Sequence, residues 1–205
     1  MTPPRRTAAS TRELRRALID HAYRLVAREG ASALTMRALA AEAGCALGLP
    51  YKVFASRDEL VSELIREEFR RLMDAFEEWI DGAGRGTVGG NLARYARLLL
   101  DSPAVTLARE MAHDAELSDA MNERAEESGV VAALEAAVTR YLAAERELGR
   151  VDRDVDVGAF GFLIAGAVHN LLVSGDAYPR PSVGRLERIL EATAARLATS
   201  QPGES

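Results

Sequence analysis

The sequence predicts an all-α protein of about nine helices, and three observations lead to that prediction. Apolar residues recur at spacings of three and four along most of the 205 residues, and no segment shows the sustained alternation of a strand. Ser or Thr precedes several of these stretches and glycine follows them, as at the two ends of helices. Hydrophobic residues make up 48% of the chain and charged residues 28%, which is typical of a folded globular protein.

The first helix is expected to begin at Ser10. Ser10 and Glu13 have the spacing of a capping box, in which each side chain satisfies a backbone N–H that the helix leaves free. Gly30 is expected to end this helix. Its core stripe consists of Leu14, Leu18, Ala22, Leu25 and Val26.

Two short helices and one long helix are expected next. Thr35 is a candidate N-cap for the first short helix, Gly44 ends it, and a second short helix covers about residues 46–53. Ser56 and Glu59 form a second capping box, which opens the long helix. Its apolar stripe steps by three and four residues through Val61, Ile65, Phe69, Leu72, Phe76 and Ile80.

Residues 81–90 are the clearest break in the chain, because their many glycines disfavour a helix. Gly129 is a possible interruption in one of the helices expected beyond this break, and Ser182 is expected to cap the last one. These helices are expected at about 88–101, 103–114, 118–148, 154–174 and 183–197. Residues 1–9 and 200–205 are expected to be disordered tails.

Charge is distributed unevenly along the chain, although the net charge of -5 alone argues against a nucleic-acid partner. The first 60 residues hold ten basic and six acidic side chains, a net charge of +4, whereas the remainder holds 16 basic and 25 acidic side chains, a net charge of -9. A basic head on an acidic body predicts that only the head faces a polyanion. A single Cys and the absence of a long apolar run predict a cytoplasmic protein that does not enter the membrane.

Residues 35–54 have the architecture of a helix-turn-helix, with two short helices meeting at a glycine turn. Over residues 12–61 the chain resembles the N-terminal domain of the TetR family of transcriptional regulators. The resemblance rests on the order of elements, with Gly30 after an amphipathic helix and Arg57-Asp58-Glu59-Leu60 at the start of a long one. The motif residues between them are Leu34-Thr35-Met36-Arg37, Leu39-Ala40, Ala43-Gly44, Gly48, Tyr51 and Phe54.

The resemblance implies a DNA-binding domain at 10–55 and a helical ligand-binding and dimerisation domain at 56–199. It implies a homodimer that binds a double-stranded palindromic operator, most simply a repressor that an unknown small molecule releases. Phosphate or base contacts are expected from Thr35, Arg37, Tyr51, Lys52 and Arg57, and the base-facing positions are Leu47, Gly48 and Leu49.

Two residues depart from the family's usual pattern in the recognition segment. Ala46 stands where a Ser or Thr cap is usual, and Pro50 stands where Leu is usual. Both changes suggest a recognition helix with little stability of its own. An alternative function is therefore a helical small-molecule-binding or interaction protein whose head no longer reads DNA.

The body is expected to hold both the dimer interface and the ligand pocket. Small residues in the helix expected at 154–174 permit close helix approach, and the last two helices are candidates for a four-helix bundle with a second copy. The interface candidates are Phe162, Ala165, His169 and Leu190. The pocket candidates, which are aromatic, soft or polar groups on apolar helices, are Trp79, Asn91, Tyr95, Met111, His113, Phe160 and Asn170.

No cofactor, metal or enzymatic activity is expected. Glu110 and His113 have the Glu-x-x-His spacing of di-iron helical bundles, but such sites need a second pair, and neither His21 nor His169 has a Glu three residues before it. The sequence also contains no nucleophile elbow, phosphate-binding glycine loop or HExxH pattern. A helical metalloenzyme is therefore the weakest of the three alternatives.

Overall fold

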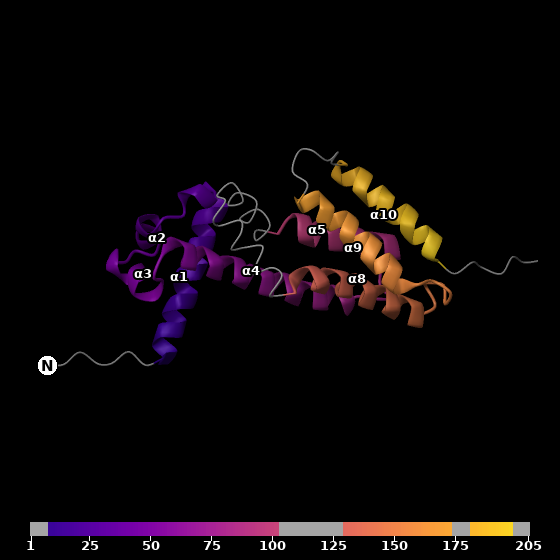
Figure 1. Cartoon of the computed structure of the whole chain (residues 1–205), viewed down its shortest axis with the longest axis horizontal. Coiled ribbons are helices and arrows are strands. Elements are labelled where there is room, and N and C mark those ends of the chain that lie inside the picture. Colours follow the sequence, from indigo (N-terminus) through magenta and orange to yellow (C-terminus); the bar gives the residue numbers. More distant parts are fainter. Residues whose placement is uncertain (1–7, 103–128, 174–180, 199–205) are drawn as a thin grey trace, which may run out of the picture. The chain divides into compact units, whose positions relative to one another are not determined.

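The computed structural model describes residues 8–102, 129–173 and 181–198, and every regular element in these ranges is a helix (Figure 1). The prediction of an all-α fold is confirmed. The described residues form two compact units, of which unit 1 comprises those up to Phe69 and unit 2 comprises those from Arg70 onward. The long helix α4 (Arg57–Ile80) belongs to unit 1 up to Phe69 and to unit 2 from Arg70.

Unit 1 packs three helices and a short 3-10 turn around the beginning of α4. These elements are α1 (Ala8–Glu29), η1 (Ala31–Ala33), α2 (Met36–Glu42) and α3 (Gly48–Val53), drawn in indigo and purple in Figure 1. Burial of apolar side chains drives this packing. The most buried are Leu18, Ala22, Leu25, Leu34, Leu39, Phe54, Leu60, Val61 and Leu64, each at most 2% exposed.

The predicted start of the first helix is wrong. Helix α1 already includes Ala8 and Ala9, so Ser10 lies inside it and does not form the N-terminal cap. Alanine is the strongest helix former, and two alanines before Ser10 extend the helix past the capping sequence. The predicted stop is confirmed, because α1 ends at Glu29 and Gly30 has a φ of 84°, in the left-handed region that favours glycine.

The start of α4 confirms the predicted capping function of Ser56 and Glu59. The Ser56 Oγ accepts a hydrogen bond of 3.1 Å from the Glu59 N–H. The Glu59 carboxylate reaches one residue further back than a standard capping box and accepts from the Ala55 N–H at 2.6 Å. Two free N–H groups at this helix start are therefore satisfied.

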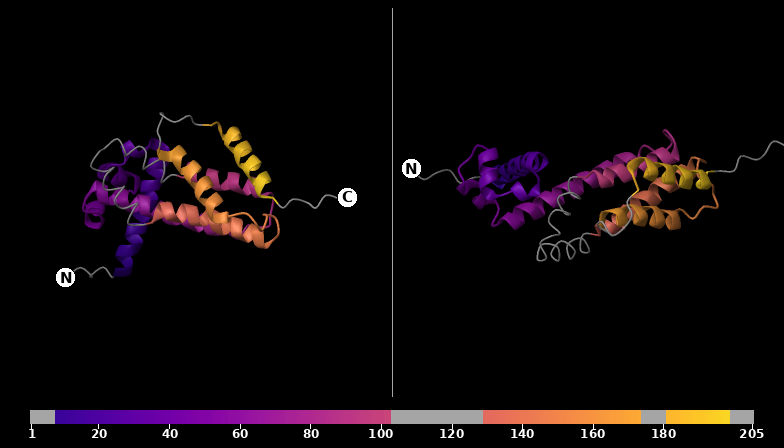
Figure 2. Two further views of the ribbon diagram at one scale, coloured as in Figure 1. Left: turned by 45° about the vertical axis from the view of Figure 1, so that its right-hand side comes forward. Right: turned by 90° about the horizontal axis from the view of Figure 1, so that it is seen from above.

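Unit 2 contains two pairs of packed helices. Helix α5 (Val88–Leu100) packs on α10 (Val183–Leu197), and α8 (Val130–Glu147) packs on α9 (Val157–Val173), the two orange helices in both views of Figure 2. The first pair approaches closely at Gly89, where a Cβ atom would lie 2.7 Å from the Glu191 Cα. Among the described residues, no helix is both long and apolar enough to cross a membrane.

The helix boundaries in unit 2 bear on two predictions. Gly129, with a φ of 64°, immediately precedes α8, as its possible role as an interruption suggested, and residues 118–128 of the predicted 118–148 helix lie outside the described residues. Helix α9 begins at Val157 and not at residue 154, because the Asp156 Oδ1 accepts from the Gly158 and Ala159 N–H groups at 3.1 and 3.0 Å and so caps the helix. The helix predicted at 103–114 lies outside the described residues.

Candidate nucleic-acid interface

Helix α2 begins and ends as its sequence predicts. Thr35 is extended, with φ -121° and ψ 158°, and its Oγ1 accepts a hydrogen bond of 3.0 Å from the Ala38 N–H. Gly44 has a φ of 60° and donates its N–H to the Ala41 carbonyl at 3.1 Å. The glycine turns the chain away from α2 and allows α3 to begin four residues later.

Helix α3 begins without a side-chain cap. Leu47 occupies the N-cap position and makes no capping hydrogen bond, and the Leu49 N–H instead donates to the Ala46 carbonyl at 2.8 Å. Pro50 lies buried in the first turn, where a helix leaves its N–H groups unpaired and a proline costs no helical hydrogen bond. The predicted lack of a side-chain cap is confirmed, but the N-cap residue is Leu47 and not Ala46, and the helix begins at Gly48 and not at residue 46.

Arginines from α1 and α4 hold the helix-turn-helix in place. The Arg57 Nε donates to the Leu34 carbonyl at 2.7 Å, just before the Thr35 cap. The Arg28 Nη2 lies 2.8 Å from the Glu42 carboxylate at the end of α2. The hydrogen bond from Arg28 lowers the pKa of Glu42 below its ordinary value. Some of the basic side chains in the first 60 residues therefore stabilise the fold.

The predicted DNA-contacting residues fall into an exposed group and a group engaged in the fold. Tyr51 and Leu47 are 56% and 43% exposed. Leu49 is half-buried, and Arg57 is half-buried with its Nε on the Leu34 carbonyl. The remaining predicted contacts, all exposed, are Thr35, Arg37, Gly48 and Lys52.

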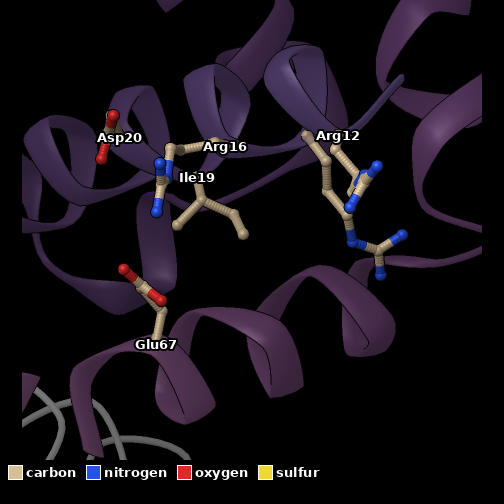
Figure 3. Close-up of a pocket in the computed structure, with 6 residues that line it drawn as sticks. Arg12, Arg16, Ile19, Asp20 and Glu67 are labelled. Carbon is tan, nitrogen blue, oxygen red and sulfur yellow. The ribbon is translucent and has the colours of Figure 1, made fainter. Parts of the chain in front are cut away.

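A small groove lies between α1 and α4 in unit 1, with a cavity volume of about 140 Å³. Figure 3 shows the Arg16 guanidinium pointing from α1 toward the Glu67 carboxylate on α4. Because carboxylates offset the guanidinium groups in this groove, we do not assign it to the DNA-facing surface. Its lining residues are Arg12, Arg15, Arg16, Ile19, Asp20 and Glu67.

Two predicted pocket residues, Trp79 and Tyr95, are part of a buried aromatic cluster in unit 2. Their ring centroids lie 5.3 Å apart, and the Trp79 ring lies 4.3 Å from that of Tyr141. The Trp79 Nε1 donates to the Asn91 carbonyl at 2.8 Å, and the Tyr95 hydroxyl donates to the Leu134 carbonyl at 3.3 Å. Burial raises the pKa of the Tyr95 hydroxyl. Both polar groups are satisfied within the core.

Of the other pocket candidates, Asn91 lies beside this cluster, because its carbonyl accepts from the Trp79 indole. The Asn91 side chain donates to the Arg85 carbonyl at 2.8 Å and thereby closes the glycine-rich loop. Phe160 and Asn170 are half-buried on α9, and Met111 and His113 lie outside the described residues. The Glu110–His113 pair also lies there, and the residues that the structure describes contain no group of three or more potential metal ligands.

The four dimer-interface candidates are divided between surface and core. Phe162 is 64% exposed on α9, and His169 is half-buried. Ala165 and Leu190 are each only 4% exposed and pack within the chain itself. The exposed apolar surface of α9 and α10 consists instead of Phe162, Leu163, Val183 and Ile189.

One residue for which the sequence predicted no role, Arg15, makes several contacts in unit 1. Its guanidinium donates to the Val53 carbonyl at 3.1 Å and to the carboxylates of Glu59 and Glu63 at 2.7 and 2.9 Å. A sequence signal did exist, because Arg15 precedes Leu18 by three residues and so lies on the buried face of α1. A charged residue at such a position requires partners from other elements.

Comparison with known proteins places this helix-turn-helix in a family. The sequence profile described as "Bacterial regulatory proteins, tetR family" matches residues 18–64. A segment of 74 residues is 31% identical to the HTH-type nicotine-responsive transcriptional repressor HdnoR of Paenarthrobacter nicotinovorans and covers 36% of this chain and 38% of that protein. A segment of 110 residues is 30% identical to the HTH-type transcriptional repressor KstR of Rhodococcus jostii and covers 54% of this chain and 46% of that protein. The chain thus spans less than half the length of these curated relatives.

Solved structures extend the similarity to nearly the whole chain. The TetR transcription regulatory protein from Mycobacterium vanbaalenii is 25% identical, with a TM-score of 0.57 over 93% of this chain and 98% of that one. A TetR-family transcriptional regulator from Pectobacterium atrosepticum shares the fold, with a TM-score of 0.67 at 18% identity over 95% of this chain and 99% of that one. Residues 18–64 therefore match the tetR family of bacterial regulatory proteins, and nearly the whole chain has the fold of TetR-family regulators of known structure.

Proposed function

We propose that this protein is a transcriptional repressor that binds a palindromic DNA operator as a homodimer and is released by a small molecule. The single observation that carries the proposal is the exposed surface of α2 and α3. It combines the cations of Arg37 and Lys52 with the exposed side chains of Leu47 and Tyr51. Cations that bind phosphate, beside apolar groups that reach base edges, are what a major-groove surface requires.

Few polar side chains of this surface are available to recognise the base sequence of the DNA. Leu47 and Leu49 are suited to contact thymine methyl groups, and Arg37 is suited to a phosphate or a guanine edge. Gly48 adds no side chain, so the backbone of α3 can approach the DNA closely at that point. We therefore expect much of the specificity to come from the shape and deformability of the operator.

Exposed apolar side chains on α9 and α10 support the homodimer. Phe162 and Leu163 are 64% and 60% exposed on α9, and Val183 and Ile189 are 63% and 46% exposed on α10. Large apolar groups exposed on a helix indicate a surface that a partner covers. A second copy presenting the same helices would bury both sets in an isologous interface.

The long helix α4 is the natural route from effector to DNA, because one helix supplies residues to both units. A change in its tilt would alter the separation of the two recognition helices in the dimer. Successive major grooves on one face of DNA lie about 34–36 Å apart, so a changed separation weakens binding to both half-sites together. A ligand can drive this change only if it binds one arrangement more tightly than the other.

The proposal is tested by measuring affinity for the dyad-symmetric DNA that flanks the gene for this chain. Wild-type protein should bind it at moderate salt, and Arg37→Ala and Tyr51→Ala should each bind more weakly. Arg94→Ala is the matched control, because Arg94 is an exposed arginine on α5 in unit 2 and should leave the affinity unchanged. Absence of binding to any palindromic site, or normal binding by both head variants, contradicts the proposal.

A further inference from the structure

One guanidinium group connects three elements of unit 1. The Arg15 Nη1 donates to the carbonyl of Val53, the last residue of α3, at 3.1 Å. The Arg15 Nη2 donates to Glu59 at 2.7 Å and Glu63 at 2.9 Å, both on α4. The guanidinium also lies 4.9 Å from the ring centroid of the fully buried Phe54. Arg15 itself belongs to α1, so it links α1, the end of α3 and the start of α4.

The turn between α3 and α4 is fixed by the same group of contacts. Glu59, which accepts from Arg15, also accepts from the Ala55 N–H at 2.6 Å. Phe54, between Val53 and Ala55, is buried beneath the Arg15 guanidinium. The three residues that join the two helices thus have little freedom to reorient while these contacts persist.

Helix α3 depends on such external contacts because it has few of its own. It contains six residues and lacks a side-chain cap at its N-terminal end. A helix of this length has negligible stability in isolation, and its orientation is therefore set by tertiary contacts. The Arg15–Val53 hydrogen bond is one such contact, and it holds the C-terminal end of α3.

Arg15 is poorly suited to bind DNA phosphate directly. Its side chain is 31% exposed, and its charge is balanced by two carboxylates within 3 Å. A cation that is already neutralised within the protein adds little to the phosphate contacts that supply non-specific affinity. Its influence on DNA binding must therefore act through the position of α3.

We propose that Arg15 is a positioning residue that sets the ratio of specific to non-specific DNA affinity without contacting DNA. The inference rests on the proposed function. Specific affinity requires that α3 meet base edges in the correct orientation, whereas non-specific affinity requires only the phosphate contacts. Removing the Arg15 hydrogen bonds should therefore reduce operator affinity and spare affinity for unrelated DNA.

The test is Arg15→Lys, compared with Arg16→Lys as the matched control on the exposed neighbouring position. Lysine keeps the positive charge but lacks the planar fork that bonds the carbonyl and both carboxylates at once. Affinity is measured for the operator found with the wild-type protein and for a scrambled duplex of the same length. We expect Arg15→Lys to lower the ratio of the two affinities about tenfold, roughly the effect of one charge-assisted hydrogen bond, and Arg16→Lys to leave it unchanged.

Several outcomes overturn the inference. An unchanged ratio for Arg15→Lys shows that α3 does not need this contact. Equal losses on both duplexes show a direct phosphate contact if thermal unfolding is unchanged, and a merely structural role if it is not. Should Arg15→Lys fail to fold, Glu63→Gln removes one charged partner of Arg15 and keeps an acceptor. This second variant should lower the ratio several-fold, and an unchanged ratio would again overturn the inference.

Failure of the proposed function is distinguishable from failure of this inference. A wild-type protein that prefers no duplex over its scrambled counterpart contradicts the proposed function, and the inference falls with it. A wild-type protein with a clear operator, combined with an unaffected Arg15→Lys variant, contradicts the inference alone.

Discussion

Arg57 donates from its Nε to the main-chain carbonyl of Leu34 at 2.7 Å, so the first residue of α4 holds the segment that leads into α2. Leu34 is fully buried, and its carbonyl lies one residue before the Thr35 cap. The contact joins positions 23 residues apart in the chain. Arg57 is thereby engaged in the fold, whereas Arg37 is exposed on α2.

We expect Arg57→Gln to lower the free energy of unfolding by about 1–2 kcal/mol, because it removes a hydrogen bond from a charged donor. Arg37→Gln, the matched control, should change the free energy of unfolding by less than about 0.5 kcal/mol, as is usual at exposed positions. Urea unfolding followed by circular dichroism measures both. Equal effects of the two substitutions would contradict the distinction between a structural and a DNA-facing arginine.

Lys52 is expected to contribute through charge alone, since it is exposed in the last turn of α3. Lys52→Gln should weaken binding to all DNA sequences alike. The slope of the logarithm of affinity against the logarithm of salt concentration should become shallower by about 0.9 for each phosphate that the variant no longer neutralises. Arg94→Gln in unit 2 should leave the slope unchanged. A changed base preference with an unchanged slope would instead indicate that Lys52 reads bases.

Trp79, the one tryptophan of the chain, is expected to act as a core residue. It is 1% exposed, its ring packs against that of Tyr141 with centroids 4.3 Å apart, and its indole N–H is satisfied by the Asn91 carbonyl. Trp79→Ala should therefore lower the free energy of unfolding by about 3–5 kcal/mol, and Trp79→Phe should cost less because it leaves a smaller cavity. A decrease below about 1 kcal/mol for the alanine variant is much smaller than the contribution of a core residue. It would indicate that the Trp79 side chain lines an open pocket.

Acid is expected to weaken the junction between α3 and α4. The Ala55 N–H, and then Arg15, stabilise the Glu59 carboxylate and lower the pKa of Glu59 in the folded protein below its ordinary value of 4.5. A lowered folded pKa means that this stabilisation is fully present above the unfolded value and is lost as the pH falls through the folded value. The free energy of unfolding should therefore decrease below about pH 4.5, and less steeply in Glu59→Gln. Identical pH profiles of the two proteins would contradict this.

Much of the fold was predictable because it depends on local sequence. The caps at Thr35 and Ser56 and the glycine stop after Glu42 each involve residues within a few positions of one another. The start of α1 was not predicted correctly, since Ala8 and Ala9 extend the helix past a suitable capping sequence. Competition between two local signals, propensity and capping, decided that boundary.

The candidate site was predictable only in part, because its charges have partners far away in sequence. Counting charges identified the basic head, but it did not reveal that Arg15, Arg28 and Arg57 bind acceptors 14 to 48 residues away. In unit 2 the polar groups of Trp79 and Tyr95 suggested a pocket, whereas backbone carbonyls from other helices satisfy both. Such partners depend on tertiary packing, which cannot be deduced from the apolar periodicity of a single helix.

The most direct test of the central claim is the number of chains bound to one dyad-symmetric duplex, measured by sedimentation together with affinity for an isolated half-site. The account predicts two chains on each full site and much weaker binding to the half-site, because a dimer places one recognition helix in each of two successive major grooves. One chain on each duplex with equal affinity for the half-site, or no preference for the dyad over unrelated DNA, would contradict it.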